Sequence, residues 1–384
     1  MGRLAKLPPY LFSAIDEAKA RARAAGVAVV DLGVGDPDRP TPPELVEVMA
    51  HAVADPAGHR YPAQKGDAGF KRTISSWLER RHGVAVDPDS QVLVLIGSKE
   101  GLGHLPLTCV EEGDNTLVPD LGYPVYGQAT LLAGGEPRTF SLAPERGFLP
   151  DLDELAGKMD DRTRLLFVNY PNNPTGAVAD GEFWKDLTAL CGERNVTLVN
   201  DAAYLEVTLD GSRPVSLLAH ADPAKDRVIE LHSLSKMFNM TGWRIAFAAG
   251  HPEVVGDLGR VKESMDSGVF TAVQATAGYA LGERFENLLD GVLAPYRARR
   301  EVVVTALREA GYDVFDSPAT FYVWSRVPEG GASVEFCGRV LDEIGVVVTP
   351  GLGFGPGGEG WFRISLTAAD AEVAEGARRF RDWT

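Results

Sequence analysis

The chain has 384 residues, of which 45% are hydrophobic and 24% charged, so it has the composition of an ordinary globular protein and enough length for two domains. The formal net charge of −16 argues against nucleic acid or an anionic membrane as a partner, because both need a basic face. The N-terminal segment has no apolar signal core, and no apolar run approaches the ~20 residues that span a bilayer.

The spacing of cysteines and histidines argues against two further kinds of site. The three cysteines, Cys109, Cys191 and Cys337, are far apart and odd in number, which fits neither a zinc site nor a disulfide framework. The seven histidines include no pair at a ligand spacing. We therefore expect no metal, and a reducing cytoplasm as the location.

The first two thirds of the chain alternate short apolar runs with helical patterns, which predicts parallel strands joined by crossover helices. An opening arm or short helix is followed by a strand at Val27–Leu32 and a helix from Glu44 to about Ala54. Helices are also expected at Lys99–Cys109 and Glu182–Arg194. Seven strands are expected to form a mostly parallel α/β sheet: Val92–Ile96, Asn115–Val118, Arg138–Leu142, Leu165–Asn169, Thr197–Asn200, Val228–His232 and Ile245–Ala249.

A long helical pattern from about Gly282 to Ala310 predicts a link to a second, smaller α+β lobe. Domains are thus expected at 1–50 (the arm and part of the small domain), 51–285 (the large domain) and 286–384 (the small domain). The small lobe is expected to contain strands at Tyr312–Phe315, Thr320–Trp324, Gly345–Val348 and Trp361–Leu366, and helices at Ser333–Glu343 and Ala369–Arg379.

The stretch Ser233-Leu234-Ser235-Lys236, followed by Arg244, predicts a binding site for a phosphate beside a reactive amine. Apolar neighbours of Lys236 disfavour its charged form, and a neutral amine is a nucleophile toward an aldehyde. The two hydroxyls and the guanidinium supply donors for a dianion. One molecule that carries both groups is pyridoxal 5'-phosphate (PLP). A surface lysine in a serine-rich loop is the alternative.

Other polar side chains follow the predicted strands, at the sheet edge where ligands bind in doubly wound folds. Ser98 begins a helix and fits either an anion site or an ordinary N-cap. Asn173, in a loop stiffened by prolines, is a donor for a phenolate oxygen or part of an Asx turn. Asp201 either pairs with a protonated pyridine nitrogen or caps a helix. Tyr204, three residues later, could reach the 3-oxygen of the same pyridine ring. Tyr123 could stack on the ring or belong to the core.

Arg363 lies within an apolar strand, where an arginine needs an anion, either a substrate carboxylate or a structural partner. The nearby glycines of 351–355 suggest a dinucleotide fingerprint, but Pro356 follows where a helix should open. We expect this segment to be a mobile loop that carries Arg363 toward the substrate.

Taken together, these motifs resemble the fold-type I, class I/II PLP-dependent aminotransferases over nearly the whole chain. The resemblance implies that Lys236 forms the Schiff base with PLP, and that substrate binds at Arg363, Asn173 and the backbone of Gly35. It also implies a homodimer in which Tyr61 of the neighbouring subunit completes the phosphate site. The remaining cofactor contacts that it implies are Ser98, Lys99, Glu100, Tyr123, Asn173, Asp201, Tyr204, Ser233, Ser235 and Arg244.

Within this family the chain is similar to the LL-diaminopimelate aminotransferases in the stretches 33–38, 97–101, 122–126, 169–173 and 238–244. The implied reaction is ping-pong transfer of the amino group to 2-oxoglutarate. Some of these enzymes place a glutamate just after the tyrosine equivalent to Tyr61, but here Pro62–Lys65 contains no acid. Alanine, aromatic or N-succinyl-diaminopimelate aminotransferases, a C–S β-lyase and a non-catalytic PLP-binding module are the alternatives.

Overall fold

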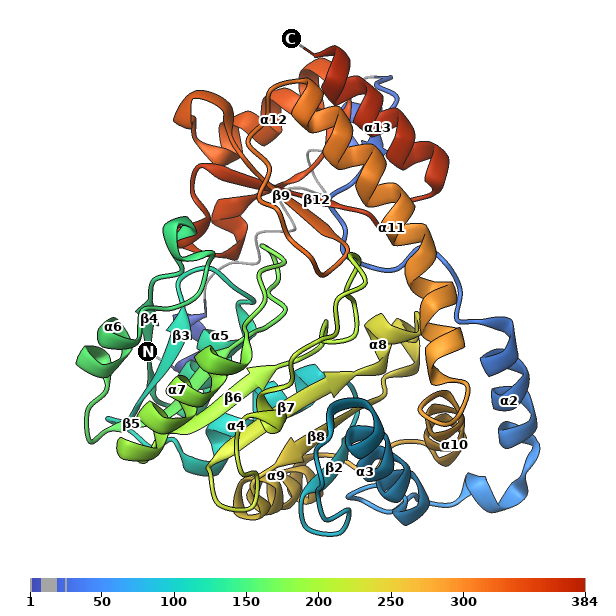
Figure 1. Ribbon diagram of the computed structural model, residues 1–384, viewed down its shortest axis with the longest axis vertical. Coiled ribbons are helices and arrows are strands. Elements are labelled where there is room, and N and C mark those ends of the chain that lie inside the picture. The colour runs from blue at the N-terminus through green and yellow to red at the C-terminus, as the bar shows by residue number, and fades with distance from the viewer. Residues whose placement is uncertain (1, 8–18, 25, 384) are drawn as a thin grey trace.

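The computed structural model describes residues 2–7, 19–24 and 26–383, so part of the expected opening arm, at 8–18, lies outside the described residues. A seven-stranded sheet forms the centre of the lower lobe in Figure 1, and two small sheets lie in the upper lobe. The order of the large sheet is β2-β8-β7-β6-β5-β3-β4. Only β8 runs antiparallel to its neighbours, which confirms the mostly parallel α/β sheet.

All seven predicted strands of this sheet are present, within two residues of their expected starts. They are β2 (Val92–Leu95), β3 (Asn115–Pro119), β4 (Glu136–Phe140), β5 (Thr163–Val168), β6 (Thr197–Asp201), β7 (Val228–Ser233) and β8 (Ala246–Gly250). The central strands β6 and β7 are fully buried, as expected for a sheet covered by helices on both faces. The helices of this lobe are α2 (Pro43–Ala54), α3 (Ala68–His82), α4 (Ser98–Cys109), α5 (Val125–Ala133), α6 (Leu152–Lys158), α7 (Gly181–Glu193), α8 (Leu234–Met237), α9 (Pro252–Met265) and α10 (Thr271–Ala280).

The upper lobe begins with α11 (Phe285–Glu309), the predicted linking helix, which rises from beside α10 in Figure 1. Its antiparallel sheet has the order β11-β12-β9, and a separate parallel pair joins β1 to β10. The C-terminal helix packs along α11. The elements of this lobe are β1 (Val30–Asp31), β9 (Tyr322–Arg326), β10 (Val346–Val347), β11 (Thr349–Pro350), β12 (Trp361–Ser365), α12 (Ser333–Ile344) and α13 (Asp370–Asp382).

Local sequence signals account for where several helices begin and end. Asp67 and Asp180 cap α3 and α7 by accepting hydrogen bonds from the amides of Phe70 and Phe183. Gly83 and Gly345 end α3 and α12 in the left-handed conformation, with φ of 71° and 66°. None of the helices that the structure describes is both long enough and apolar enough to span a membrane.

One strand that the sequence predicts in the small lobe is absent. Tyr312–Phe315 is not a strand, because only an isolated bridge joins Val314 to Ser325. The strand expected at 345–348 is present but shorter, as β10, which pairs with β1, and β11 after it pairs with β12. The domain boundary expected at residue 50 stays a prediction, and residue 50 itself lies inside α2, which packs against α10.

The glycine-rich segment at 351–358 also differs from its expected role as a loop that carries Arg363. It forms two short 3-10 turns, at Gly351–Phe354 and Pro356–Gly358, in place of an open loop. Arg363 itself lies in the middle of β12 and is brought to the cavity by the sheet.

Candidate active site

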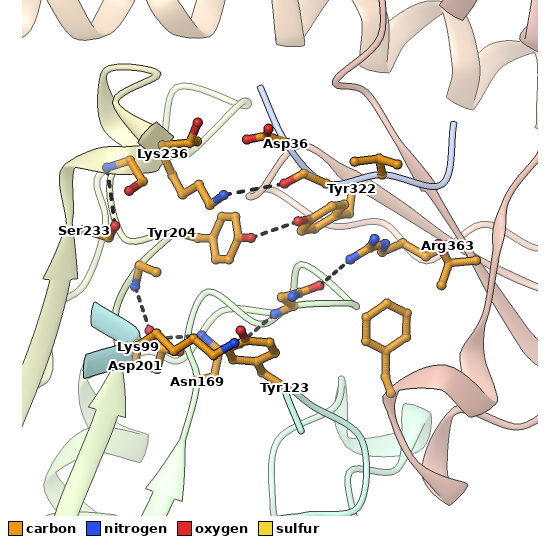
Figure 2. Close-up of a pocket in the computed structure, with 18 of the residues that line it drawn as sticks. Asp36, Lys99, Tyr123, Asn169, Asp201, Tyr204, Ser233, Lys236, Tyr322 and Arg363 are labelled. Carbon is orange, nitrogen blue, oxygen red and sulfur yellow. Dashed lines mark hydrogen bonds between the residues drawn. The ribbon is translucent and has the colours of Figure 1, made fainter. Parts of the chain in front are cut away.

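A cavity of about 500 Å³ is lined by residues that follow strands of the large sheet and by residues of the upper lobe (Figure 2). The structure therefore brings together residues that are far apart in the sequence, such as Gly33 and Arg363, which are separated by 330 positions. The lining includes twelve of the predicted site residues: Gly35, Ser98, Lys99, Tyr123, Asn173, Asp201, Tyr204, Ser233, Ser235, Lys236, Arg244 and Arg363.

Lys236 reaches the cavity from the one-turn helix α8, which begins directly after β7. The hydroxyl of Ser233 caps this turn by accepting a hydrogen bond from the amide of Ser235 at 3.3 Å. The Lys236 Nζ atom lies 3.5 Å from the carbonyl oxygen of Gly35 and 5.8 Å from the ring centre of Phe321. The amine is thus held at the centre of the cavity, half-buried and close to one apolar ring.

Asp201 ends β6 and is 5% exposed. Its carboxylate accepts hydrogen bonds from the Tyr126 hydroxyl at 2.9 Å and from the Ala203 amide at 3.3 Å. Among the described residues, no cation pairs with it. Burial therefore raises the pKa of Asp201 to about 6, although these two donors and the charge of Lys236 oppose that effect. A buried carboxylate that lacks a cation fits a protonated ring nitrogen such as that of PLP.

Donors for a phosphate gather at the start of α4. Ser98 is its first residue, and Gly97 before it has φ of 82°. A Cβ atom at Gly97 would come within 2.2 Å of Arg244 Nη2, so only glycine allows the guanidinium to lie against this backbone. Together with Ser233 and Ser235, this cradle of amides, hydroxyls and one guanidinium fits a dianion.

Arg363 is 3% exposed and occupies the opposite side of the cavity. Its Nη1 donates to Asn173 Oδ1 at 2.8 Å and its Nη2 to the Gly33 carbonyl at 3.0 Å. Its Nε is buried without a partner among the described residues. Burial lowers the pKa of Arg363, yet a guanidinium stays charged at neutral pH. A buried arginine with unused donors fits a substrate carboxylate.

Two predicted site residues, Glu100 and Tyr61, do not line the cavity. Glu100 accepts from the Ile96 amide and from Lys262 Nζ at 3.0 Å, on a side of α4 that faces away from the cavity. Burial raises the pKa of Glu100. With His104 and Asp266 it forms a group that could hold a metal, but the Lys262 ammonium already lies there, 2.7 Å from Asp266. Tyr61 is 95% exposed and does not reach its own chain's cavity.

Sequence reasoning assigned no role to three aromatic residues of the site, Tyr126, Tyr322 and Phe354. Tyr126 could have been found, because it follows Tyr123 by three residues at the start of α5 and so shares a face with it. Tyr322 and Phe354 carry no such signal, since each belongs to a separate element of the upper lobe.

Comparison with known proteins identifies the family. Residues 27–380 match the family described as aminotransferase class I and II. The chain is 49% identical to an LL-diaminopimelate aminotransferase of Nitratidesulfovibrio vulgaris, covering 98% of this chain and 97% of that protein. It is 45% identical to an enzyme of the same name from Aquifex aeolicus, with coverage of 99% and 98%.

Solved structures agree with this assignment. A probable N-succinyldiaminopimelate aminotransferase from Thermus thermophilus is 37% identical, with a TM-score of 0.90 and coverage of 97% of this chain and 99% of that one. A mutant aspartate aminotransferase from the same organism is 27% identical, with a TM-score of 0.92 and coverage of 100% and 98%. The chain belongs to the class I and II aminotransferases and is a PLP-dependent enzyme.

Proposed function

We propose that the enzyme transfers an amino group from LL-2,6-diaminopimelate to 2-oxoglutarate. The observation that carries the choice of amino acid is the 44–49% identity, over 98–99% of this chain, to eight relatives that all bear the name LL-diaminopimelate aminotransferase. The cavity supports this choice because Asp36 also lines it, which gives a carboxylate that neither the cofactor nor the substrate's first carboxylate would use.

Bound PLP supplies an aldehyde and an electron-withdrawing ring. Lys236 Nζ would bond the aldehyde carbon, and Asp201 would hold the ring nitrogen protonated. Tyr204 and Asn173 would donate to the 3-oxygen, and Tyr123 would cover one face of the ring. The phosphate would be held by Ser98, Ser233, Ser235 and Arg244.

Once the amino acid is bound, Arg363 orients its α-carboxylate and so places the Cα hydrogen toward Lys236. The Lys236 amine would act as the base that takes this proton and as the acid that delivers it to the adjacent carbon of the bound cofactor. Gly35 keeps its carbonyl oxygen 3.5 Å from Nζ, a contact that can hold the amine in place between the two positions. The oxo acid leaves, and 2-oxoglutarate reverses the sequence.

The amino-donor preference is tested with purified enzyme, 2-oxoglutarate and a panel of donors. LL-diaminopimelate should give the highest kcat/KM, with one glutamate formed per oxo acid. A preference for N-succinyl-diaminopimelate, alanine or an aromatic amino acid would reject the proposed donor and keep the transamination. Pyruvate and ammonia formed from a cysteine conjugate without glutamate would instead indicate a C–S β-lyase.

Attachment of the cofactor is tested separately. Borohydride reduction followed by peptide mapping should place the label on Lys236, and Lys236→Ala should lose both the visible absorption band and turnover. A label on another lysine, or unchanged turnover in the variant, would contradict this site.

We also propose that the active enzyme is a homodimer in which Tyr61 enters the neighbour's phosphate site. The support is that Tyr61 is 95% exposed and that apolar side chains on the packed pair α2 and α10 (Val46, Val53, Tyr279) are exposed as well. Mixing the separately weakened variants Tyr61→Ala and Lys236→Ala should restore activity, since one site of each hybrid dimer is intact. No gain on mixing would contradict shared sites.

A cytoplasmic location is part of the same proposal. All three cysteines are free, and Cys191 and Cys337 are buried, as suits a reducing compartment. Separating cell fractions and assaying the activity in each would test it.

A further inference from the structure

Tyr322 lies at the point where the two halves of the active site meet. It is the first residue of β9, is 2% exposed and lines the cavity between Tyr204 and Arg363 (Figure 2). In the proposed function, Tyr204 faces the 3-oxygen of PLP and Arg363 binds the substrate carboxylate. The contacts that Tyr322 makes with both of them indicate that it links these two functions.

The hydroxyl of Tyr322 lies 2.9 Å from the hydroxyl of Tyr204, and the two side chains point toward one another in Figure 2. Burial, and secondarily this neighbour, raise the pKa of Tyr204, so Tyr204 keeps its proton and can donate it. Each hydroxyl carries a single proton. If Tyr204 donates its proton into the cavity, Tyr322 must therefore be the donor in the hydrogen bond between the two hydroxyls. A hydroxyl that accepts one hydrogen bond donates a stronger one, so Tyr322 strengthens the hydrogen bond that Tyr204 makes into the cavity.

The ring of Tyr322 supports Arg363 from one face. The centre of the guanidinium lies 4.0 Å from the Tyr322 ring centre and 4.6 Å from that of Phe354 on another side. The aromatic contacts fix the plane of the guanidinium, while its edges bond to Asn173 and Gly33. A side chain without a ring at position 322 would leave this plane free to rotate.

The backbone holds Tyr322 in this position. Thr320 has φ of 66°, an uncommon conformation for a β-branched residue, and its amide donates to the Val207 carbonyl at 2.7 Å. The Val207 amide in turn donates to the carbonyl of Tyr204 at 2.8 Å, so the turn that carries Tyr204 is tied to the start of β9. A Cβ atom at Gly35 would lie 2.3 Å from the Tyr322 hydroxyl, so glycine there leaves room for it.

We propose that Tyr322 is a positioning residue that acts on the reaction from two sides: its hydroxyl donates to Tyr204, and its ring holds the plane of Arg363. The first contact tunes the group that faces the 3-oxygen of PLP, and the second aligns the group that binds the substrate carboxylate. The proposal depends on PLP binding at this site but not on which amino acid is the natural donor.

The hydroxyl is tested by titrating the visible absorption band of the PLP-loaded enzyme between pH 5 and 10. Tyr322→Phe keeps the ring and removes only the hydroxyl, so the apparent pKa of the band should rise by about 0.5 unit, because a weaker Tyr204 donor stabilises the 3-oxygen less. Tyr204→Phe should raise it more, and Tyr204→Phe with Tyr322→Phe should equal Tyr204→Phe alone. The other charged groups around the pair, Arg363, Asp201 and Lys236, are unchanged in all three variants.

Tyr296→Phe is the matched control. Tyr296 is 1% exposed, its ring packs 5.1 Å from that of Phe321, and its hydroxyl has no partner among the described residues. This variant should leave the titration unchanged. The proposal would be overturned if the apparent pKa of the band did not shift in Tyr322→Phe, or if it shifted equally in Tyr322→Phe and Tyr296→Phe. Additive shifts in the double variant of Tyr204 and Tyr322 would also overturn it.

The ring is tested by steady-state kinetics with the amino acid and with 2-oxoglutarate. Tyr322→Leu should raise KM for both substrates about tenfold, whereas Tyr322→Phe should raise it less than about twofold, because only the first removes the aromatic face. Equal KM values in the two variants would overturn this half of the proposal. Should Tyr322→Leu fail to fold, the titration of the absorption band still tests the role of the hydroxyl. The role of the ring is then tested by Tyr322→Trp, which keeps an aromatic face and should hold KM closer to wild type than Tyr322→Met does.

Discussion

Two buried carboxylates lie on neighbouring strands of the large sheet, and their pKa values are shifted in opposite directions. Asp201 ends β6, has two hydrogen-bond donors and no cation among the described residues, and its pKa is raised by burial to about 6. Glu230 lies on β7, opposite Asn200, and is completely buried. Although burial acts to raise it, the pKa of Glu230 is held at about 2 by His232, Ser216 and Asn200.

The partners of Glu230 explain the difference. Its carboxylate accepts from Ser216 Oγ at 2.7 Å, Asn200 Nδ2 at 3.0 Å and the Leu217 amide at 2.9 Å. His232 Nε2 lies 2.9 Å from it on the same strand. Glu230 is thus satisfied by the fold itself, whereas Asp201 is satisfied only when a cation enters the cavity. A buried acid with too few partners indicates a ligand site, and one with a full set indicates a structural role.

The largest expected effect is that of Asp201→Ala on activity. Without the carboxylate nothing holds the ring nitrogen protonated, so kcat/KM should fall about a thousandfold or more, equivalent to about 4 kcal/mol. The free energy of unfolding of the cofactor-free protein at pH 7.5 should not fall, because the carboxylate itself is unfavourable there. Steady-state kinetics and urea unfolding measure the two quantities. Near-wild-type rates would show that Asp201 merely caps the turn after β6.

Glu230 should show the reverse pattern. Glu230→Ala leaves Asn200, Ser216 and the Leu217 amide without their shared acceptor, so the free energy of unfolding should fall by about 3 kcal/mol. Glu230→Gln keeps the shape and one acceptor oxygen, and should lose less. Both variants should retain the PLP band when folded. If Glu230→Ala is as stable as wild type, the difference in pKa between Asp201 and Glu230 does not reflect their hydrogen-bond partners.

These two carboxylates also show what the sequence could predict. Asp201 follows a short apolar strand together with Tyr204, and the polar residues after other parallel strands point to the same sheet edge, so most of the cavity could be predicted. Glu230 lies within an apolar strand, and nothing in its neighbourhood shows that three donors from elsewhere would meet it.

The features of the site that the sequence could not predict have the same origin, since they concern the directions of side chains and partners distant in the sequence. Glu100 follows Lys99 directly, but successive residues of a helix point about 100° apart, so one lines the cavity while the other meets Lys262. Tyr322 reaches Tyr204 across 118 residues of sequence. Such contacts depend on how the upper lobe packs, which local patterns do not encode.

The pH dependence of stability should separate the two carboxylates in the cofactor-free protein. Asp201 has a folded-state pKa above its unfolded value, so its contribution is fully present below about pH 4 and is lost as the pH rises through 6. Relative to Asp201→Asn, wild type should lose about 2 kcal/mol of unfolding free energy between pH 4.5 and 7.5. Glu230 has a lowered pKa, so its contribution is lost only as the pH falls from about 4.5 toward 2. Urea unfolding at the two pH values measures the difference, and parallel curves for wild type and Asp201→Asn would contradict the raised pKa.

The smallest expected effect is that of Tyr126→Phe, which removes one of the two hydrogen-bond donors to Asp201. The lost hydroxyl donates to Asp201 at 2.9 Å, and burial and the nearby carboxylate hold the pKa of Tyr126 well above its usual value, so it remains a donor. The lost bond stabilises the charged carboxylate by about 1.5 kcal/mol, so the pKa of Asp201 should rise further. PLP needs the carboxylate, so it should bind up to about tenfold more weakly near pH 6. Absorbance titration of cofactor-free protein with PLP measures this, with Tyr170→Phe as the control, because that buried hydroxyl donates at 2.7 Å to the Phe148 carbonyl instead. Equal PLP affinity in wild type and Tyr126→Phe would mean that the entering cation alone satisfies Asp201, and that its protein partners contribute nothing to the binding of the cofactor.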